Sequence, residues 1–208
     1  MKGFNSISQI DRNFKLTDLV KELQLKKEER EEVKNIERFL LAHALDTDNT
    51  GLHSTDNVEL IYVFHVNLKS KETPSKFLKA VDKRTNAHTV FEIEHEGGYN
   101  YMMANKRIAG TIVVGDYIER ESREEWEFIG DPRDLEDLYC ILLAFVLNLL
   151  KRPEDTVDSI AKRSKRIAEI ETEIAKLECK KKSESQLNKT IKINEQIRVL
   201  KQQAEEEQ

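Results

Sequence analysis

The run Val58–Lys69, with the sequence VELIYVFHVNLK, constrains the fold more than any other stretch of the chain. Apolar side chains occupy alternate positions along it, and further apolar groups fall between them, so both faces of the run are hydrophobic. Most of these side chains are β-branched or aromatic, as is typical of strands. We therefore expect a central β-strand that is buried on both sides, with helices and turns before it.

Composition limits what can surround this strand. Hydrophobic residues make up 38% of the 208 residues and charged residues make up 35%, so the chain can form one core and an extended polar part. The formal net charge of -5 argues against a surface that is built throughout to attract nucleic acid.

The cysteines and the apolar runs bear on the cellular compartment. Cys140 and Cys179 form no Cys-x-x-Cys motif, which predicts neither a disulfide framework nor a zinc site and favours a reducing cytoplasm. The N-terminal residues lack the apolar stretch of a secretion signal. The most apolar run, Leu138–Leu150, is shorter than the about twenty residues that a membrane-spanning helix needs. We expect a core helix there, and no membrane partner.

Two helices are predicted before the central strand. Leu16, Leu19, Val20 and Leu23 have the i, i+3, i+4, i+7 spacing of a short amphipathic helix. Residues Lys26–Leu45 are predicted to form one longer helix, because an apolar stripe develops in its second half and would enter the core.

The polar connection that follows has part of the pattern of a calcium-binding loop. Asp46, Asp48, Thr50 and Gly51 occupy positions one, three, five and six of such a loop. The twelfth position is Asn57 where a bidentate glutamate is required, and a strand follows in place of a helix. We interpret the segment as a turn and expect no metal.

Strands and helices alternate after the central strand. The predicted elements are a helix from Thr73-Pro74 to about Arg84, a strand His88–Glu96, a Gly97-Gly98 turn, strands Tyr99–Lys106 and Gly110–Glu119, a possible fourth strand Glu125–Ile129, and a helix Arg133–Lys151 after an Asp131-Pro132 cap. The strand-helix-strand unit should have parallel strands. This order predicts an α+β fold with a small mixed sheet and flanking helices.

The composition changes at Arg152-Pro153, where we divide the chain into residues 1–152 and 153–208. From Glu154 onward glycine, proline and aromatic residues disappear, and apolar residues recur at heptad spacing in two charged segments. The heptad phase breaks at Lys180–Ser185, which favours an antiparallel helical hairpin over one continuous rod.

The apolar stripe of this C-terminal part is too thin to be stable alone, so it must be buried on its hairpin mate, on a second copy or on another protein. Intramolecular packing and partner binding remain alternatives at this point. The side chains that we predict to bind a partner are Ile160, Ile167, Ile170, Ile174, Leu177, Ile193, Ile197 and Leu200.

The chain contains an incomplete set of nuclease residues. A nuclease of the restriction type places acids and a lysine on adjacent strands, where the acids hold Mg²⁺. Here Asn67 stands where an acid is needed before Lys69, and Asp56 and Glu59 both precede the same strand. The sequence therefore predicts no catalytic residues and no cofactor. The alternative uses Asp56, Glu59, Asn67 and Lys69 with Mg²⁺, and needs Glu92 or Glu94 to approach Lys69.

Two further features have an ordinary structural interpretation. His65 lies within the strand, and we expect a hydrogen-bonded histidine of the core or sheet edge there. The basic run Lys162, Arg163, Lys165 and Arg166 could contact nucleic-acid phosphates, but neighbouring acids and missing aromatic residues favour a solvated helix face.

Two blocks of the sequence, VELIYVFHVNLKSKETPSKFLKAVDK and AEIETEIAKLECKKKSESQLNKTIKINEQIRVLK, are similar to a bacterial family of domains of unknown function, the one catalogued as four-three-nine-one. Members commonly have Phe-Glu-Val-Glu-Leu-Lys where this chain has Phe64–Lys69, so His65 and Asn67 replace acids. The resemblance implies no established activity. It implies a genomic setting beside DNA methyltransferases and helicases of restriction and anti-phage systems.

Two functional hypotheses follow. The first is a non-catalytic accessory protein of such a system, which contacts a protein partner or a second copy through its C-terminal helices. The partner could belong to a methyltransferase or helicase complex. The second is a degenerate nuclease-like domain that binds or cleaves DNA.

Overall fold

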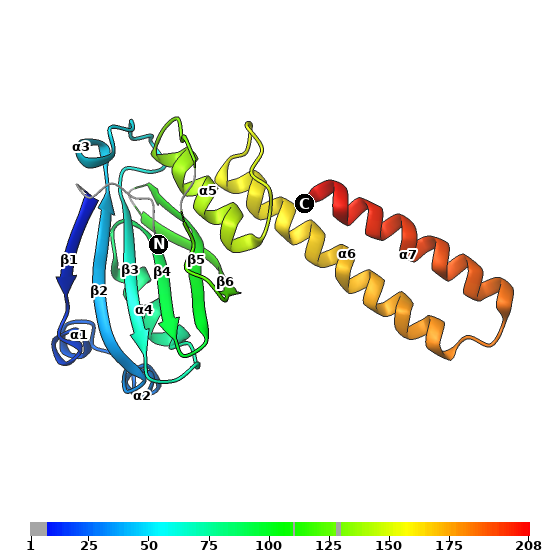
Figure 1. Ribbon diagram of the computed structural model, residues 1–208, viewed down its shortest axis with the longest axis horizontal. Coiled ribbons are helices and arrows are strands. Elements are labelled where there is room, and N and C mark those ends of the chain that lie inside the picture. Colours follow the sequence, from blue (N-terminus) through cyan, green and yellow to red (C-terminus); the bar gives the residue numbers. More distant parts are fainter. Residues whose placement is uncertain (1–7, 110, 128–129) are drawn as a thin grey trace.

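The computed structural model describes residues 8–109, 111–127 and 130–208. A twisted sheet carries helices on both faces, and a two-helix arm projects from one side of it (Figure 1). The predicted α+β class, with a mixed sheet followed by a helical hairpin, is confirmed.

The sheet has six strands in the order β1-β2-β3-β4-β5-β6. Only β3 and β4 are parallel, and every other neighbouring pair is antiparallel. The strands are β1 (Gln9–Asn13), β2 (Ile36–Leu45), β3 (Ile61–Leu68), β4 (His88–His95), β5 (Gly98–Ala109) and β6 (Thr111–Ser122). The predicted central strand is therefore confirmed as β3, and its parallel pairing with β4 is confirmed as well.

Seven helices complete the described part of the chain. They are α1 (Leu16–Glu22), α2 (Lys27–Val33), α3 (Thr47–Thr50), α4 (Ser75–Arg84), α5 (Leu135–Leu147), α6 (Val157–Ser183) and α7 (Leu187–Glu207). Helix α4 forms the crossover between β3 and β4, as expected. In the described residues, no helix combines the length and the apolar character needed to cross a membrane.

Each face of the sheet has its own core, because successive residues of β3 point in opposite directions. Phe64 stacks between Phe39 and Phe91 on the face that α2 and α4 cover, and α4 adds Phe77 to this group. On the other face, Ile61 and Val63 pack under α5. Burial on both faces explains why β3 is apolar at nearly every position.

The prediction of one helix over Lys26–Leu45 is wrong. The chain forms the short helix α2 and then β2, which pairs with β3 along its whole length. The register of this pair shifts between Ile36 and Arg38 and again between Leu41 and His43. A β-bulge at each shift breaks the strict alternation that identifies a strand, and it leaves apolar residues at a helix-like spacing.

Smaller differences concern the ends of elements. Helix α4 begins one residue later than predicted, with Pro74 at the N-cap. Helix α5 begins at Leu135, because Asp134 rather than Asp131 caps it by accepting a hydrogen bond from the backbone N–H of Asp137. The possible fourth strand Glu125–Ile129 lies partly outside the described residues.

The arm consists of α6 and α7, which pack antiparallel and turn within residues 184–186, so the predicted hairpin is confirmed. The first turns of α6 lie beyond the predicted boundary at residue 153 but still belong to the core of the sheet domain. Val157 and Ile160, in the first turns of α6, are buried in the core beneath the sheet domain's helix α5. The arm thus begins inside the core and leaves it as one unbroken helix (Figure 1).

Candidate functional site

A polar cluster joins β3 and β4 on the sheet face that α5 partly covers. Because Asn67 lies opposite Glu94 in the parallel register, side chains of the two strands meet in pairs. His65 Nδ1 lies 3.0 Å from Glu92 Oε2, and His65 Nε2 lies 3.0 Å from Glu94 Oε2. Asn67 donates from Nδ2 to the same Glu94 oxygen at 2.6 Å.

The partners of His65 determine its charge. Both are carboxylates, which accept hydrogen bonds when ionised, so both contacts are satisfied together only when both ring nitrogens carry a proton. The hydrogen bond to Glu92 raises the pKa of His65, although burial of the ring acts in the opposite direction. Burial also acts against ionisation of Glu92, yet the pKa of this carboxyl is lowered, with the hydrogen bond from His65 among the causes.

This cluster should make stability depend on pH. A raised histidine pKa stabilises the folded state fully below the unfolded pKa of about 6.5, and this contribution is lost as pH rises through the folded pKa. We expect His65→Gln to lower the free energy of unfolding by about 1–3 kcal/mol at pH 6 and by less at pH 9. Urea unfolding of both proteins at these two pH values measures the difference. A difference that grows with pH would contradict a raised pKa of His65.

A second polar network is buried beneath α4. Lys106 donates from Nζ to Asp82 Oδ1 at 3.0 Å, and to the backbone oxygens of Asp82 and Thr85 at 2.7 and 2.6 Å. Tyr117 donates to the other carboxylate oxygen of Asp82 at 2.7 Å, and Thr89 also donates to this carboxylate. The side chains of Lys106 and Asp82 are each only 1% exposed. Burial lowers the pKa of Lys106.

His88 lies beside this network, at the start of β4. Its Nε2 lies 2.9 Å from the backbone oxygen of Lys106, and its ring packs edge-on against Tyr139. Its Nδ1 is buried and makes no hydrogen bond. Burial lowers the pKa of His88 to about 4, so the ring is neutral at pH 7. The buried side chains of Lys106 and His88 thus both have an evident structural role.

The nuclease residues do not assemble. Asp56 and Glu59 are exposed before β3 begins, whereas Asn67 and Lys69 lie at its far end. Lys69 donates from Nζ to the backbone oxygen of Lys34 at 2.9 Å. Glu92 and Glu94 do lie on the neighbouring strand, as the alternative requires, but they contact His65, and Glu94 also contacts Asn67.

The segment with partial calcium-loop spacing forms a capped turn. Asp46 accepts a hydrogen bond from the backbone N–H of Asn49 and caps the short helix α3, and Gly51 ends that helix with a positive φ of 73°. This agrees with the interpretation as a turn. Across the described ranges, no group of three or more His, Cys, Asp or Glu side chains is arranged to hold a metal ion.

Five of the eight predicted partner-binding residues face inward. Ile160 lies in the core of the sheet domain, and the interface between α6 and α7 buries Ile167, Ile170, Ile193 and Ile197. The structure therefore corrects the prediction of partner contact for these five side chains, because the chain itself already covers them. The remaining three, Ile174, Leu177 and Leu200, are only partly buried.

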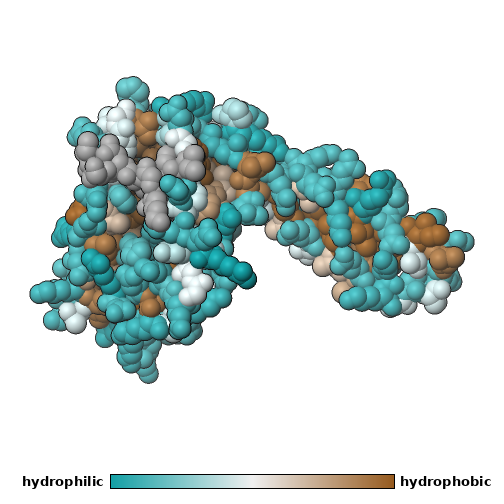
Figure 2. All heavy atoms as spheres, viewed as in Figure 1, coloured by the Kyte–Doolittle hydropathy of each residue, from teal (hydrophilic) through white to brown (hydrophobic). Residues whose placement is uncertain are grey.

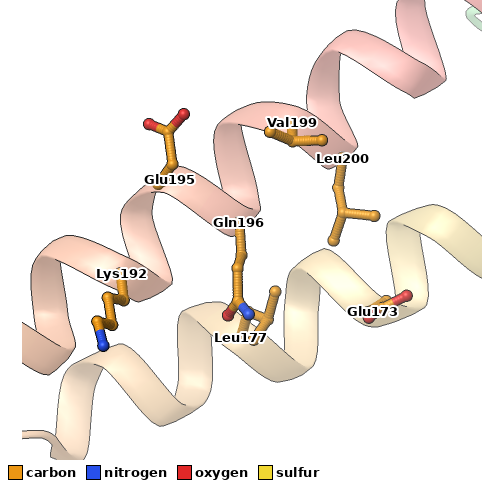
Figure 3. Close-up of a pocket in the computed structure, with 7 residues that line it drawn as sticks. All are labelled: Glu173, Leu177, Lys192, Glu195, Gln196, Val199 and Leu200. Carbon is orange, nitrogen blue, oxygen red and sulfur yellow. The ribbon is translucent and has the colours of Figure 1, made fainter.

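A groove on the arm uses two of these three residues. Leu177, Val199 and Leu200 form its apolar part, and Glu173, Lys192, Glu195 and Gln196 complete the lining. In Figure 3, Leu177, Gln196 and Leu200 lie between α6 and α7, whereas Glu195 points away from α6. The groove has a volume of about 520 Å³. Apolar residues are also visible on the arm in the space-filling view (Figure 2). Val199 is 43% exposed, Ile191 56% and Leu187 73%.

The four basic residues predicted to contact nucleic acid are not all on the surface. Arg163 is buried, and its guanidinium donates to Asp155 Oδ2 at 2.9 Å and to the backbone oxygen of Leu150 at 2.8 Å. The structure therefore also corrects the prediction that Arg163 contacts nucleic acid, since this side chain holds α6 to the preceding loop. Lys162 and Lys165 are exposed, and Arg166 pairs with Glu207.

Sequence reasoning missed the polar cluster and five of the seven residues that line the groove. Glu92 and Glu94 were considered as partners for Lys69, but the register that directs them to His65 is not encoded in either strand alone. Val199 and Gln196 lie outside the heptad seam, and a stripe beside the seam is the one signal that could have identified them.

Comparison with known proteins places the chain in a family. A family model described as "Domain of unknown function (DUF4391)" matches residues 6–203. No curated protein and no solved structure matches the chain. Because the family model spans nearly all of the sequence, the chain belongs to the DUF4391 family of domains of unknown function.

Proposed function

We propose that this protein is a non-catalytic interaction module, in which the sheet domain holds a helical arm that binds a protein partner. The observation that carries the proposal is the groove of Leu177, Val199 and Leu200 on the arm, outside the sheet domain. An apolar groove between two helices fits a further amphipathic helix, because such a helix can continue the packing of the pair.

Two features of the arm support this proposal. The inward-facing isoleucines hold α6 and α7 together without help from a partner, so the groove exists before binding. The buried contact between Arg163 and Asp155 fixes the base of the arm. A preformed and rigid site loses little conformational entropy on association, which favours binding.

The biological setting remains part of the proposal. We propose that the partner belongs to a DNA-modification or anti-phage assembly, of the kind that contains methyltransferases and helicases. The family resemblance is the support for this step. We further propose that the protein acts in the cytoplasm, as the free thiols Cys140 and Cys179 suggest.

Site-specific photocrosslinking in the native host tests the interaction surface. A photoreactive amino acid at Gln196, within the groove, should give discrete adducts of higher mass, and the same group at the exposed Glu96 of the sheet domain should not. Val199→Asp should reduce the Gln196 adducts about tenfold, because it places a charge in the apolar part. Adducts from Glu96 alone, or adducts insensitive to Val199→Asp, would contradict the proposal.

The nuclease-like alternative has weaker support from the geometry. It is favoured by the carboxylates of Glu92 and Glu94 on the strand beside Lys69, but Lys69 contacts a backbone oxygen instead of either acid. Duplex DNA cleavage assayed with Mg²⁺, with Glu94→Gln and Lys69→Ala as comparisons, tests this alternative. Cleavage that both substitutions abolish would establish it and refute the non-catalytic proposal.

A further inference from the structure

The groove lies within a stripe whose charge changes sign along the arm. Glu169, Glu173, Leu177 and Lys180 follow the i, i+4, i+8, i+11 spacing of one face of α6. The two glutamates lie toward the base of the arm and the lysine toward its tip. On α7, Lys192 lines the tip end of the groove, and the uncharged Gln196 lies nearer the base.

These charges are not neutralised within the arm. Glu169, Glu173, Lys180 and Lys192 are all exposed, and none of them forms an ion pair with another described residue. The same arm does contain ion pairs elsewhere, such as Arg198 with Glu195 and Lys201 with Glu178. The stripe therefore keeps two acids and two lysines available for an external partner.

The apolar groove lies between the two sets of charges. Leu177 falls between Glu173 and Lys180 on α6, and Val199 falls nearer the middle of α7 than either end. A two-fold axis through the groove would place two grooves face to face. The same rotation would place the basic end of each stripe over the acidic end of the other, because an isologous contact pairs residue i with j and j with i.

We propose that the occupant of the groove is a second copy of this chain, whose arm packs antiparallel to the first and forms a four-helix bundle. This inference rests on the proposed function of the arm and names its partner. Lys180 and Lys192 of one copy approach the acidic ends of the partner's stripe, while the two apolar grooves bury one another. Complementary charges then favour the antiparallel orientation. In a parallel orientation, acidic ends would face acidic ends and basic ends would face basic ends, and these like charges would repel one another.

Charge-swap variants of the full chain test this arrangement by sedimentation velocity over a concentration series. The acid-reversed variant carries Glu169→Lys and Glu173→Lys, and the base-reversed variant carries Lys180→Glu and Lys192→Glu. Each variant alone places like charges opposite one another, and we expect its self-association to weaken at least about a hundredfold. Circular dichroism of each variant checks that the helices are retained.

Two combinations should restore association. An equimolar mixture of the two variants brings opposite charges together at both ends, so a heterodimer should form with near wild-type affinity. A single chain with all four reversals has the same formal net charge as the wild type and should dimerise with itself. Glu171→Lys with Lys182→Glu is the matched control, because these exposed residues lie off the stripe, and it should leave dimerisation unchanged.

Several results would overturn the inference. These are a wild-type chain that stays monomeric at all soluble concentrations, a mixture that fails to associate, or a control pair as disruptive as the stripe variants. Failure of this inference and failure of the proposed function are distinguishable. A monomeric chain whose Gln196 photocrosslinks identify a different protein would refute self-association and leave the arm as the interaction surface.

Discussion

Replacing Lys106 by methionine is expected to lower the free energy of unfolding by about 3–5 kcal/mol. The substitution leaves the Asp82 carboxylate in the core without its cation, and this carboxylate is only 1% exposed. An uncompensated buried charge costs much more than the pair contributes. Urea unfolding at pH 7 measures the loss. Lys83→Met is the matched control, because Lys83 is exposed on the same helix as Asp82, and it should change the value by about 0.5 kcal/mol or less.

The double variant Lys106→Met, Asp82→Asn separates the charge from the packing. The amide oxygen that Asp82→Asn introduces can still accept the hydrogen bond of Thr89, and the amide NH2 that replaces the other oxygen can donate to the hydroxyl of Tyr117. The double variant should therefore recover much of the stability that Lys106→Met loses. If the single substitution costs no more than the Lys83 control, the buried pair of Lys106 and Asp82 would not be a source of stability. Equal losses in the single and double variants would attribute the effect to packing.

Protonation of His88 in acid should lower the free energy of unfolding by on the order of 3 kcal/mol between pH 6.5 and pH 4. The pKa of His88 is lowered to about 4, whereas an unfolded histidine has a pKa of about 6.5. The unfolded state therefore binds more protons in this window. The contribution of His88 to stability is complete above pH 6.5 and is lost as pH falls toward its folded pKa.

His88→Gln tests this effect against the other groups that titrate in acid. The glutamine amide can replace Nε2 as the donor to the backbone oxygen of Lys106 and cannot be protonated. We expect the variant to lose less stability than the wild type when unfolding is measured at pH 7, 6, 5 and 4.5. Parallel pH curves for the two proteins would show that His88 is not the responsible group.

The limits of sequence-based prediction are clear in two neighbouring strands. The sequence identifies β3 because both of its faces are buried, and no helical period fits such a run. Strand β2 pairs with it along its whole length, yet its two bulges remove the alternation, and its leucines and alanines favour a helix. Only the tertiary pairing with β3 decides the outcome.

The candidate sites depend on pairing in the same way. The heptad pattern correctly predicts a hairpin, but it selects the residues that hold the hairpin together rather than those that remain exposed. Likewise, His65 and Glu92 are far apart in the chain and come together only through the parallel register of β3 and β4. The type of a single helix or strand can be predicted from its own residues. Which side chains of two elements meet, and which stay exposed, depends on how the elements pack in the fold.

The unbroken path of α6 from the core to the tip of the arm gives the molecule the mechanics of a lever. Ile160 is fully enclosed beside α5, and Arg163 fixes the next turn to Asp155, so the helix has no free joint at its base. At about 1.5 Å per residue, its 27 residues span about 40 Å. A force applied at Ser183 therefore acts on the sheet core as torque, and the arm cannot swing without a bend in α6 or a change in its packing at the base.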